Sequence, residues 1–419
     1  MIIQILLLIH LLNGIKIAQN AYLESQETDP YSYYNGANLG KFFGGISTDP
    51  EITMSPGEMI RARGYTYENY EVETEDGFIL QLHRIPFGRT KNNSTAAIAS
   101  VYLQHGLQCT ACDFLINLEN QSLAYILAEN GFDVWLGDIR GNTYSRRHKT
   151  FTSDDNEFWD WSFDEMARYD IPAFINFILK KTSREYLYYV GHSQGAMVAF
   201  AHFSQNPKIS WKVKMFFALA PVAYLKDIKS PMRMIAFMSR ALELINNMFG
   251  SREYMPRNAL LEWMAASVCP HTIELCANML YLIGGPETGN FNKSKVPVIY
   301  GHYPAGTSVR NIAHLCQGIL KGDFSMYDYG FFKNLKEYGK PEPPSYDISQ
   351  MMVPTMIFWG VKDWLADPED VNKLIPKIKN LLGNYKFENS NHWDFIFGTN
   401  AAKDYYSIIV KTMLASEKN

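Results

Sequence analysis

The chain has 419 residues, of which 47% are hydrophobic and 14% aromatic, and its formal net charge is −4. This length accommodates one large core with an insertion, and the aromatic content excludes a largely disordered chain. We find no basic patch or stripe in the sequence, so nothing in it indicates nucleic-acid binding.

The N-terminal segment is apolar. Residues 1–12 are interrupted only by Gln4 and His10, and the run is shorter than the ~20 residues of a membrane-spanning helix. We predict a signal peptide over residues 1–18, although its start lacks a positive side chain; a buried helix or a retained anchor is the alternative. Residues 19–48 are rich in Tyr, Asn and Gly, and we expect a flexible leader or pro-segment there.

Four glycosylation sequons are consistent with passage through the secretory pathway. They begin at Asn92, Asn93, Asn120 and Asn292, and we expect only one of the first two to be modified. Together with the signal peptide, they predict a lysosomal or extracellular location.

Strand and helix patterns alternate from residue 49 to residue 223, which we expect to be the first part of the core. Residues 71–74 and 78–83 flank Asp76-Gly77, a pattern typical of a β-hairpin. Apolar strand-like runs then recur between helical patterns, at residues 101–103, 134–136, 187–190 and 213–219. This alternation predicts an α/β fold with a parallel sheet.

A G-x-S-x-G pentapeptide occupies residues 191–195, between a β-prone run at 186–190 and a helix-forming stretch at 196–203. Strand, sharp turn and helix are the geometry of a nucleophile elbow. A side chain at either glycine would clash with the neighbouring strand or helix. The pattern therefore predicts Ser193 as a nucleophile exposed at the top of the sheet.

A candidate acid follows the buried strand predicted at residues 352–360. Asp363 lies in the loop directly after this strand. Asp367 is a competitor, but it precedes Pro368 and is better placed to start the next helix. We favour Asp363 over Asp367 because of its position after the strand; both fit the order of serine, acid and histidine that hydrolases with a nucleophile elbow follow.

The candidate base is His392, on a loop after a short strand predicted at residues 385–388. Of the ten histidines, it alone follows both the serine and a post-strand aspartate. His192 lies inside the elbow, and we expect it to point away from the serine and to serve packing. His302 and His314 fall where the alternation has stopped, so a structural or cap-lining role is expected for them.

Two backbone N–H groups are candidates for stabilising a tetrahedral oxyanion. One belongs to Gln194, the residue after the nucleophile. The other belongs to Leu107, where an apolar strand at residues 99–104 runs into His105-Gly106. An ordinary strand-to-loop turn is the alternative for this second position.

The chain resembles the acid lipase family, whose members include gastric and lysosomal enzymes. The resemblance runs from about Asp49 to the C-terminus, and these segments carry it: residues 70–80, 103–107, 133–142, 162–173, 191–195, 304–308, 362–367 and 392–395. It implies an α/β-hydrolase fold, a mostly parallel sheet flanked by helices. It also implies a triad of Ser193, Asp363 and His392, oxyanion donors at Leu107 and Gln194, and hydrolysis of triacylglycerols or cholesteryl esters without a cofactor or metal.

The sequence departs from the family pattern in three places. Trp393 follows the catalytic histidine, where the family usually has leucine, so the shape of the pocket wall is expected to differ. Cys109 and Cys112 follow the oxyanion strand, where small polar residues are commoner. For the segment before Asp49 we can place no counterpart in the family.

Residues 224–346 interrupt the alternation, and the core resumes over residues 347–419. The interruption has helical apolar patterns and is rich in methionine, at Met232, Met234, Met238, Met248, Met255, Met264 and Met279. Because methionines adapt to varied apolar partners, and such hydrolases carry a cap here, we expect a helical cap or lid. Ordinary core packing is the alternative.

The chain has five cysteines, an odd number, so they cannot all be paired within it. The resemblance implies a disulfide between Cys269 and Cys276. The spacing of Cys109 and Cys112 is typical of redox or metal chemistry, but a second cysteine pair or a suitable histidine is missing nearby, so zinc is not expected. For Cys316 a buried thiol is expected.

Three classes of function are compatible with these features. The first is a lipase or steryl esterase that meets its lipid substrate at an oil–water or membrane interface, without a stable protein partner. The second is a carboxylesterase or thioesterase for smaller soluble substrates. The third is a non-catalytic binding protein with a hydrolase fold, which the intact set of Ser193, Asp363 and His392 disfavours.

Overall fold

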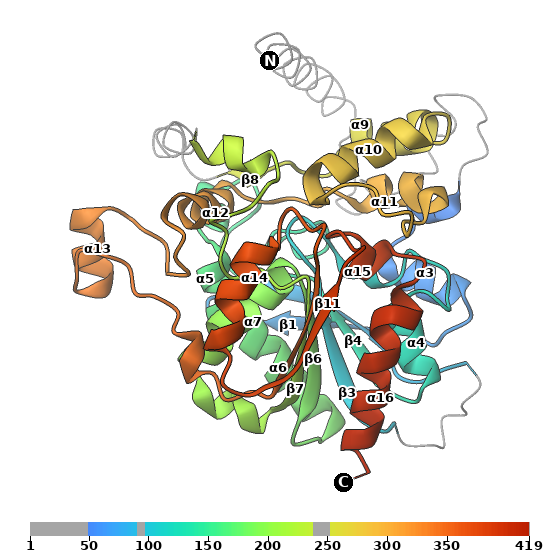
Figure 1. Cartoon of the computed structure of the whole chain (residues 1–419), viewed down its shortest axis with the longest axis horizontal. Helices are drawn as coiled ribbons and strands as arrows, with labels where there is room; N and C mark the ends of the chain where they lie inside the picture. Colours follow the sequence, from blue (N-terminus) through green and yellow to red (C-terminus); the bar gives the residue numbers. More distant parts are fainter. Residues whose placement is uncertain (1–48, 90–96, 238–251, 419) are drawn as a thin grey trace.

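The computed structural model describes residues 49–89, 97–237 and 252–418 (Figure 1). The predicted signal peptide, the leader, and the candidate positions Asn92, Asn93, Met238 and Met248 lie outside these residues. Within the described part, a central nine-stranded sheet has the order β1-β2-β4-β3-β6-β7-β10-β11, and β5 pairs with β2.

The sheet is antiparallel at one edge and parallel from β4 to β11. Its strands are β1 (Glu68–Glu73), β2 (Phe78–Ile85), β3 (Ser100–Gln104), β4 (Asp133–Gly137), β5 (Arg147–His148), β6 (Leu187–His192), β7 (Val213–Leu219), β10 (Thr355–Gly360) and β11 (Leu381–Phe387). The predicted hairpin is present as β1 and β2, and the predicted parallel sheet is confirmed.

The central strands are buried because helices cover both faces of the sheet. Residues of β3, β4, β6 and β10 are buried throughout, which explains their continuous apolar runs. In Figure 1, α6 and α7 lie on one face, and α4 and α16 lie on the other. The core helices are α3 (Pro56–Ala62), α4 (Leu123–Glu129), α5 (Phe163–Glu165), α6 (Ile171–Thr182), α7 (Gln194–Gln205), α14 (Pro368–Leu374), α15 (Asp394–Phe397) and α16 (Ser407–Ser416).

Two strand boundaries differ from the prediction. β10 begins at Thr355 rather than at residue 352, because Pro354 has no N–H to give to a ladder. β11 begins at Leu381, four residues earlier than predicted. Its first half contains Gly383 and Asn384, which are poor strand formers, yet pairing with β10 holds them in the sheet.

The insertion between β7 and β10 is mainly helical in its described part. It contains α9 (Ala259–Trp263), α10 (Ile273–Gly284), α11 (Val296–His302), α12 (Val309–Lys321) and α13 (Phe331–Tyr338), with a small sheet of β8 (Glu253–Tyr254) and β9 (Thr307–Ser308). A disulfide joins Cys269 and Cys276, ahead of and within α10. Among the helices built from the described residues, none is long and apolar enough to span a bilayer.

Candidate active site

Ser193 lies at the sharp turn between β6 and α7. Its backbone has φ 54° and ψ −118°, a conformation that costs free energy for a residue with a side chain. A Cβ on Gly191 would lie 2.6 Å from the carbonyl oxygen of Gly195, and a Cβ on Gly195 would lie 2.6 Å from that of His105. The two glycines are therefore required for the turn to pass between β3 and α7.

Asp363 and His392 form a buried hydrogen-bonded pair. The Nδ1 atom of His392 lies 2.9 Å from Oδ2 and 3.1 Å from Oδ1 of Asp363. Oδ1 also accepts hydrogen bonds from the backbone N–H groups of Leu365 and Ala366, each at 2.8 Å. Because a carboxylate only accepts, Nδ1 of His392 carries the hydrogen, which leaves Nε2 as the basic nitrogen.

Asp367 is buried as well but has a different role. Its side chain accepts the N–H of Glu369 at 3.0 Å and so caps α14, and it forms an ion pair with Lys229 at 2.7 Å. The geometry therefore favours Asp363 over Asp367 as the partner of the histidine.

One cavity brings the candidate residues together; its empty space, including the part open to solvent, is about 660 Å³. Ser193, His392, Leu107 and Gln194 all line it. A Cβ on Gly106 would lie 3.1 Å from Cβ of Ser193, so the chain at Leu107 passes directly beside the nucleophile. Most of the remaining lining is apolar, from both the core and the insertion: Val222, Leu225, Ile228, Met232, Ile283, Leu315 and Ile319.

His192 faces the active site, contrary to our expectation that it points away from it. Its ring lines the same cavity and lies 4.9 Å from the ring of His392. Nε2 of His192 donates a hydrogen bond to the carbonyl oxygen of His392 at 3.2 Å. Burial, and then the neighbouring His392, hold the pKa of His192 well below its usual value, so this ring stays neutral. Sequence could not reveal this contact, because it depends on where a loop two hundred residues later returns.

The insertion contacts the loops that carry Asp363 and His392. The carbonyl oxygen of Gly284, at the end of α10, accepts the N–H of His392 at 3.1 Å and that of Trp364 at 3.2 Å. Trp393 donates from Nε1 to the carbonyl oxygen of Leu280 at 2.7 Å. A Cβ on Gly284 would lie 2.6 Å from Cδ1 of Trp393, so a glycine is needed at this contact. Sequence reasoning missed Gly284, and its only signal was the Gly284-Gly285 pair that ends the helix.

Gln194 is held by α12. Its Nε2 donates to Oδ1 of Asn311 at 3.2 Å, and Nδ2 of Asn311 donates to Oγ1 of Thr307 at 3.1 Å. These residues adjoin the segment 304–308, one of those that carry the family resemblance, but sequence alone did not connect them with the elbow.

The two histidines of the insertion have structural roles. His314 donates from Nε2 to the carbonyl oxygen of Ser325 at 2.9 Å, and Nδ1 accepts from Ser162 at 3.0 Å. His302 donates to the carbonyl oxygen of Glu51 at 2.8 Å. Burial lowers the pKa of both rings to about 3.

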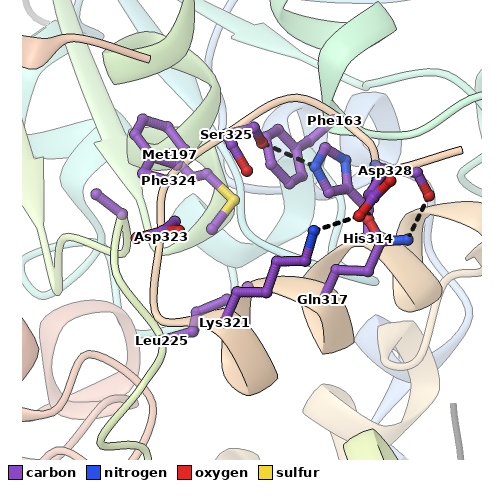
Figure 2. A pocket seen from close by; sticks show the side chains of 12 residues that line it. Phe163, Met197, Leu225, His314, Gln317, Lys321, Asp323, Phe324, Ser325 and Asp328 are labelled. Carbon is purple, nitrogen blue, oxygen red and sulfur yellow. Dashed lines mark hydrogen bonds and ion pairs between the residues drawn. The ribbon is translucent and has the colours of Figure 1, made fainter. Parts of the chain in front are cut away.

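A second, smaller pocket lies beside His314 (Figure 2). Its empty space, including the part open to solvent, is about 300 Å³. Met197 and Leu225 line both this pocket and the active-site cavity, and so lie between them. Figure 2 shows the ion pair of Lys321 and Asp328 at its rim.

Cys109 and Cys112 are buried and not disulfide-bonded. Burial raises the pKa of Cys112 to about 12 and that of Cys109 well above its usual value, so both stay protonated and unreactive. Cys316 is also buried. In the part of the chain that the structure describes, three or more His, Cys, Asp or Glu side chains do not gather into a metal-binding group.

Two of the predicted glycosylation positions are described. Asn120 is exposed. Asn292 is half-buried, and its Nδ2 donates to Oδ1 of Asn117 at 3.3 Å.

Comparison with known proteins identifies the family. The family model described as a partial alpha/beta-hydrolase lipase region matches residues 56–118, and the alpha/beta hydrolase fold model matches residues 101–256. Human lysosomal acid lipase/cholesteryl ester hydrolase is 45% identical over 370 residues, which are 88% of this chain and 92% of that protein. This chain belongs to the acid lipase family. Human gastric triacylglycerol lipase is 44% identical over 88% of this chain and 93% of its own length, and human lipase member K is 42% identical over 90% and 95%.

Membership of the acid lipase family confirms the predicted resemblance and the α/β-hydrolase fold. The elbow, the buried Asp363–His392 pair and the apolar cavity are thus features of a chain that covers nearly the full length of its lipase relatives.

Proposed function

We propose that this chain is a serine ester hydrolase that cleaves carboxylic ester bonds of neutral lipids, triacylglycerol, cholesteryl ester or both. The observation that carries the proposal is the buried Asp363–His392 pair, whose histidine lines one largely apolar cavity together with the strained Ser193. The names of the human relatives, a cholesteryl ester hydrolase and a triacylglycerol lipase, support the substrate class.

The proposed reaction has two steps. Nε2 of His392 takes the proton of Ser193 as Oγ attacks the ester carbonyl carbon, while Asp363 stabilises the resulting imidazolium. The backbone N–H groups of Leu107 and Gln194 stabilise the oxyanion. His392 then protonates the leaving alcohol, and water, activated by the same histidine, hydrolyses the acyl-enzyme.

The cavity lining favours a lipid over a small soluble ester. Much of the lining consists of aliphatic side chains of the insertion, among them Leu225, Ile283 of α10 and Leu315 of α12. A hydrocarbon chain entering this space loses its contact with water at little cost in unmet hydrogen bonds. A non-catalytic binding protein would have no need of the hydrogen-bonded carboxylate that orients His392.

We extend the proposal to an interfacial cap over residues 224–346. Leu275, Met279 and Leu282 are exposed on α10 and, spaced by four and three residues, lie on one helix face. Ile283, the next residue, lines the cavity. A lipid surface would cover this outer face and favour an open cap, in a chain that follows the secretory route to the lysosome or the extracellular space.

The test compares two substrates with the purified full-length protein. Turnover of an emulsified long-chain triacylglycerol and a cholesteryl ester is measured beside that of a dissolved short-chain ester, with Ser193→Ala as the matched inactive control. We expect turnover of the emulsified lipids that Ser193→Ala lacks. Turnover of only the dissolved ester would support the carboxylesterase alternative, and turnover by Ser193→Ala equal to the wild type would refute the assigned nucleophile.

A further inference from the structure

Helix α13 carries an apolar face that the other described residues leave uncovered. Phe331, Phe332 and Leu335 are exposed by 59%, 85% and 42%, and they fall on one side of the helix. Figure 1 shows α13 at the edge of the molecule, joined to the body by non-helical segments on both sides. Three large apolar side chains grouped on a projecting helix indicate an interaction surface.

Asn334 and Tyr338 bind the segments that flank α13 and fix this orientation. Asn334 is buried: its Nδ2 donates to Oδ1 of Asp328 at 2.7 Å and to the carbonyl oxygen of Pro341 at 2.8 Å, and its Oδ1 accepts the N–H of Tyr329 at 2.9 Å. Tyr338 donates to the carbonyl oxygen of Tyr327 at 2.8 Å. Turning the phenylalanines inward would break these four hydrogen bonds, so the apolar face is held outward.

The segment before α13 packs against α12, which also lines the active-site cavity. Gln317 on α12 exchanges two hydrogen bonds with the backbone of Asp328, at 2.8 and 2.9 Å. The guanidinium of Arg310, also on α12, lies 5.1 Å from the ring centre of Tyr327 and 4.8 Å from that of Tyr329. The same helix contributes Leu315 and Ile319 to the cavity. A surface that binds α13 is thereby held at a fixed position relative to the cavity.

Charge on α13 indicates the chemistry of the partner. Lys333 and Lys336 are exposed on the flank next to Phe332, and the exposed Lys340 follows the helix. Glu337 lies on the far side of the helix from Phe332. Lysine stems extend along apolar surface while their ammonium groups reach headgroups, and anionic lipids attract such groups.

We propose that α13 is an anchor for an anionic lipid surface. Phe331, Phe332 and Leu335 insert at the boundary between headgroups and acyl chains, and Lys333 and Lys336 bind the anionic headgroups. The anchor holds the cavity at the surface where substrate is found, an inference that rests on the proposed lipid hydrolysis.

The experiment measures binding and turnover separately on full-length protein. Co-sedimentation with phosphatidylcholine vesicles, with and without phosphatidylserine, is compared for the wild type, Phe331→Ser/Phe332→Ser and Lys333→Gln/Lys336→Gln. The matched control is Trp211→Ser, because Trp211 is an aromatic residue that is 76% exposed and far from the active site. It lies in the 3-10 helix η7 (Pro207–Trp211) before the N-terminal end of β7, whereas Ser193 follows the C-terminal end of the neighbouring parallel strand. Turnover of a dissolved short-chain ester reports on folding and chemistry.

We expect the phenylalanine variant to bind anionic vesicles at least about tenfold more weakly than the wild type and Trp211→Ser, with turnover of the dissolved ester unchanged. The lysine variant should lose only the preference for anionic vesicles. Vesicle binding by the phenylalanine variant equal to the wild type overturns the anchor, as does a wild-type dimer that this variant converts to a monomer. If every protein binds as expected but the wild type hydrolyses none of the esters, the proposed function fails and the anchor stands.

Discussion

The replacement Asp363→Asn tests the proposed acid most sharply, because the structure fixes how the amide must sit. Oδ1 accepts two backbone N–H groups, from Leu365 and Ala366, so the amide oxygen has to occupy that place. The NH₂ group then takes the place of Oδ2, 2.9 Å from Nδ1 of His392, and donates to it. Nδ1 becomes the acceptor and the ring hydrogen moves to Nε2, so the nitrogen proposed to take the proton of Ser193 is no longer basic.

The expected loss in kcat is roughly 10⁴-fold, about 5 kcal/mol of transition-state stabilisation, as for other triad aspartates changed to the amide. A dissolved short-chain ester is the right substrate, since its turnover does not depend on an interface. Asp367→Asn is the control: asparagine caps helices as well as aspartate does, and the Lys229 pair it weakens is half-exposed, so kcat should change little. A loss in kcat of less than about tenfold in folded Asp363→Asn would refute this reasoning, as would a loss in kcat that is larger in Asp367→Asn than in Asp363→Asn.

Four further predictions address the nucleophile, the cap, the pocket wall and a buried carboxyl. Ser193→Ala should keep the melting temperature within a few degrees and lose nearly all turnover of every ester; an active, folded variant would contradict the mechanism. Leu275→Asp and Met279→Asp should slow hydrolysis of emulsified lipid more than that of a dissolved ester, because they charge an exposed apolar face of α10; equal losses on both substrates would argue for an ordinary surface helix. Trp393→Leu should destabilise the fold by about 2–3 kcal/mol in denaturant titrations, since it removes a buried indole and its hydrogen bond to Leu280. Because Trp393 lines the cavity, the variant should also raise kcat/KM for bulky esters relative to short ones, and unchanged selectivity would show that Trp393 does not limit substrate size. Burial raises the pKa of Asp113 to about 7, so the wild type loses stability as the pH rises from the unfolded pKa of this carboxyl to the folded one. The stability of Asp113→Asn relative to the wild type should therefore increase from pH 4 to pH 7 and then level off. A stability difference that does not vary with pH would contradict a buried carboxyl that titrates there.

Sequence by itself determined the features that depend on neighbouring residues. The elbow was predictable because strand, glycine, serine, glycine and helix follow one another, and the turn admits no side chain at Gly191 or Gly195. The central strands were predictable because strands covered on both faces read as unbroken apolar runs. Chain order selected Asp363 and His392, since each follows a strand at the edge where Ser193 lies.

Tertiary structure alone decided the contacts between distant segments. Whether His192 faces solvent, core or active site depends on the return of the His392 loop, and no local pattern records it. The same holds for Gly284, whose carbonyl oxygen binds the His392 loop because α10 ends there. On α13 the local pattern is misleading, because an amphipathic helix ordinarily buries its apolar face. Here the buried side chain is Asn334, which is hydrogen-bonded to Asp328, Tyr329 and Pro341 in the segments that flank the helix, and the apolar face lies outside. The segment before α13 is in turn held by Gln317 and Arg310 of α12, and only the folded chain brings these contacts together.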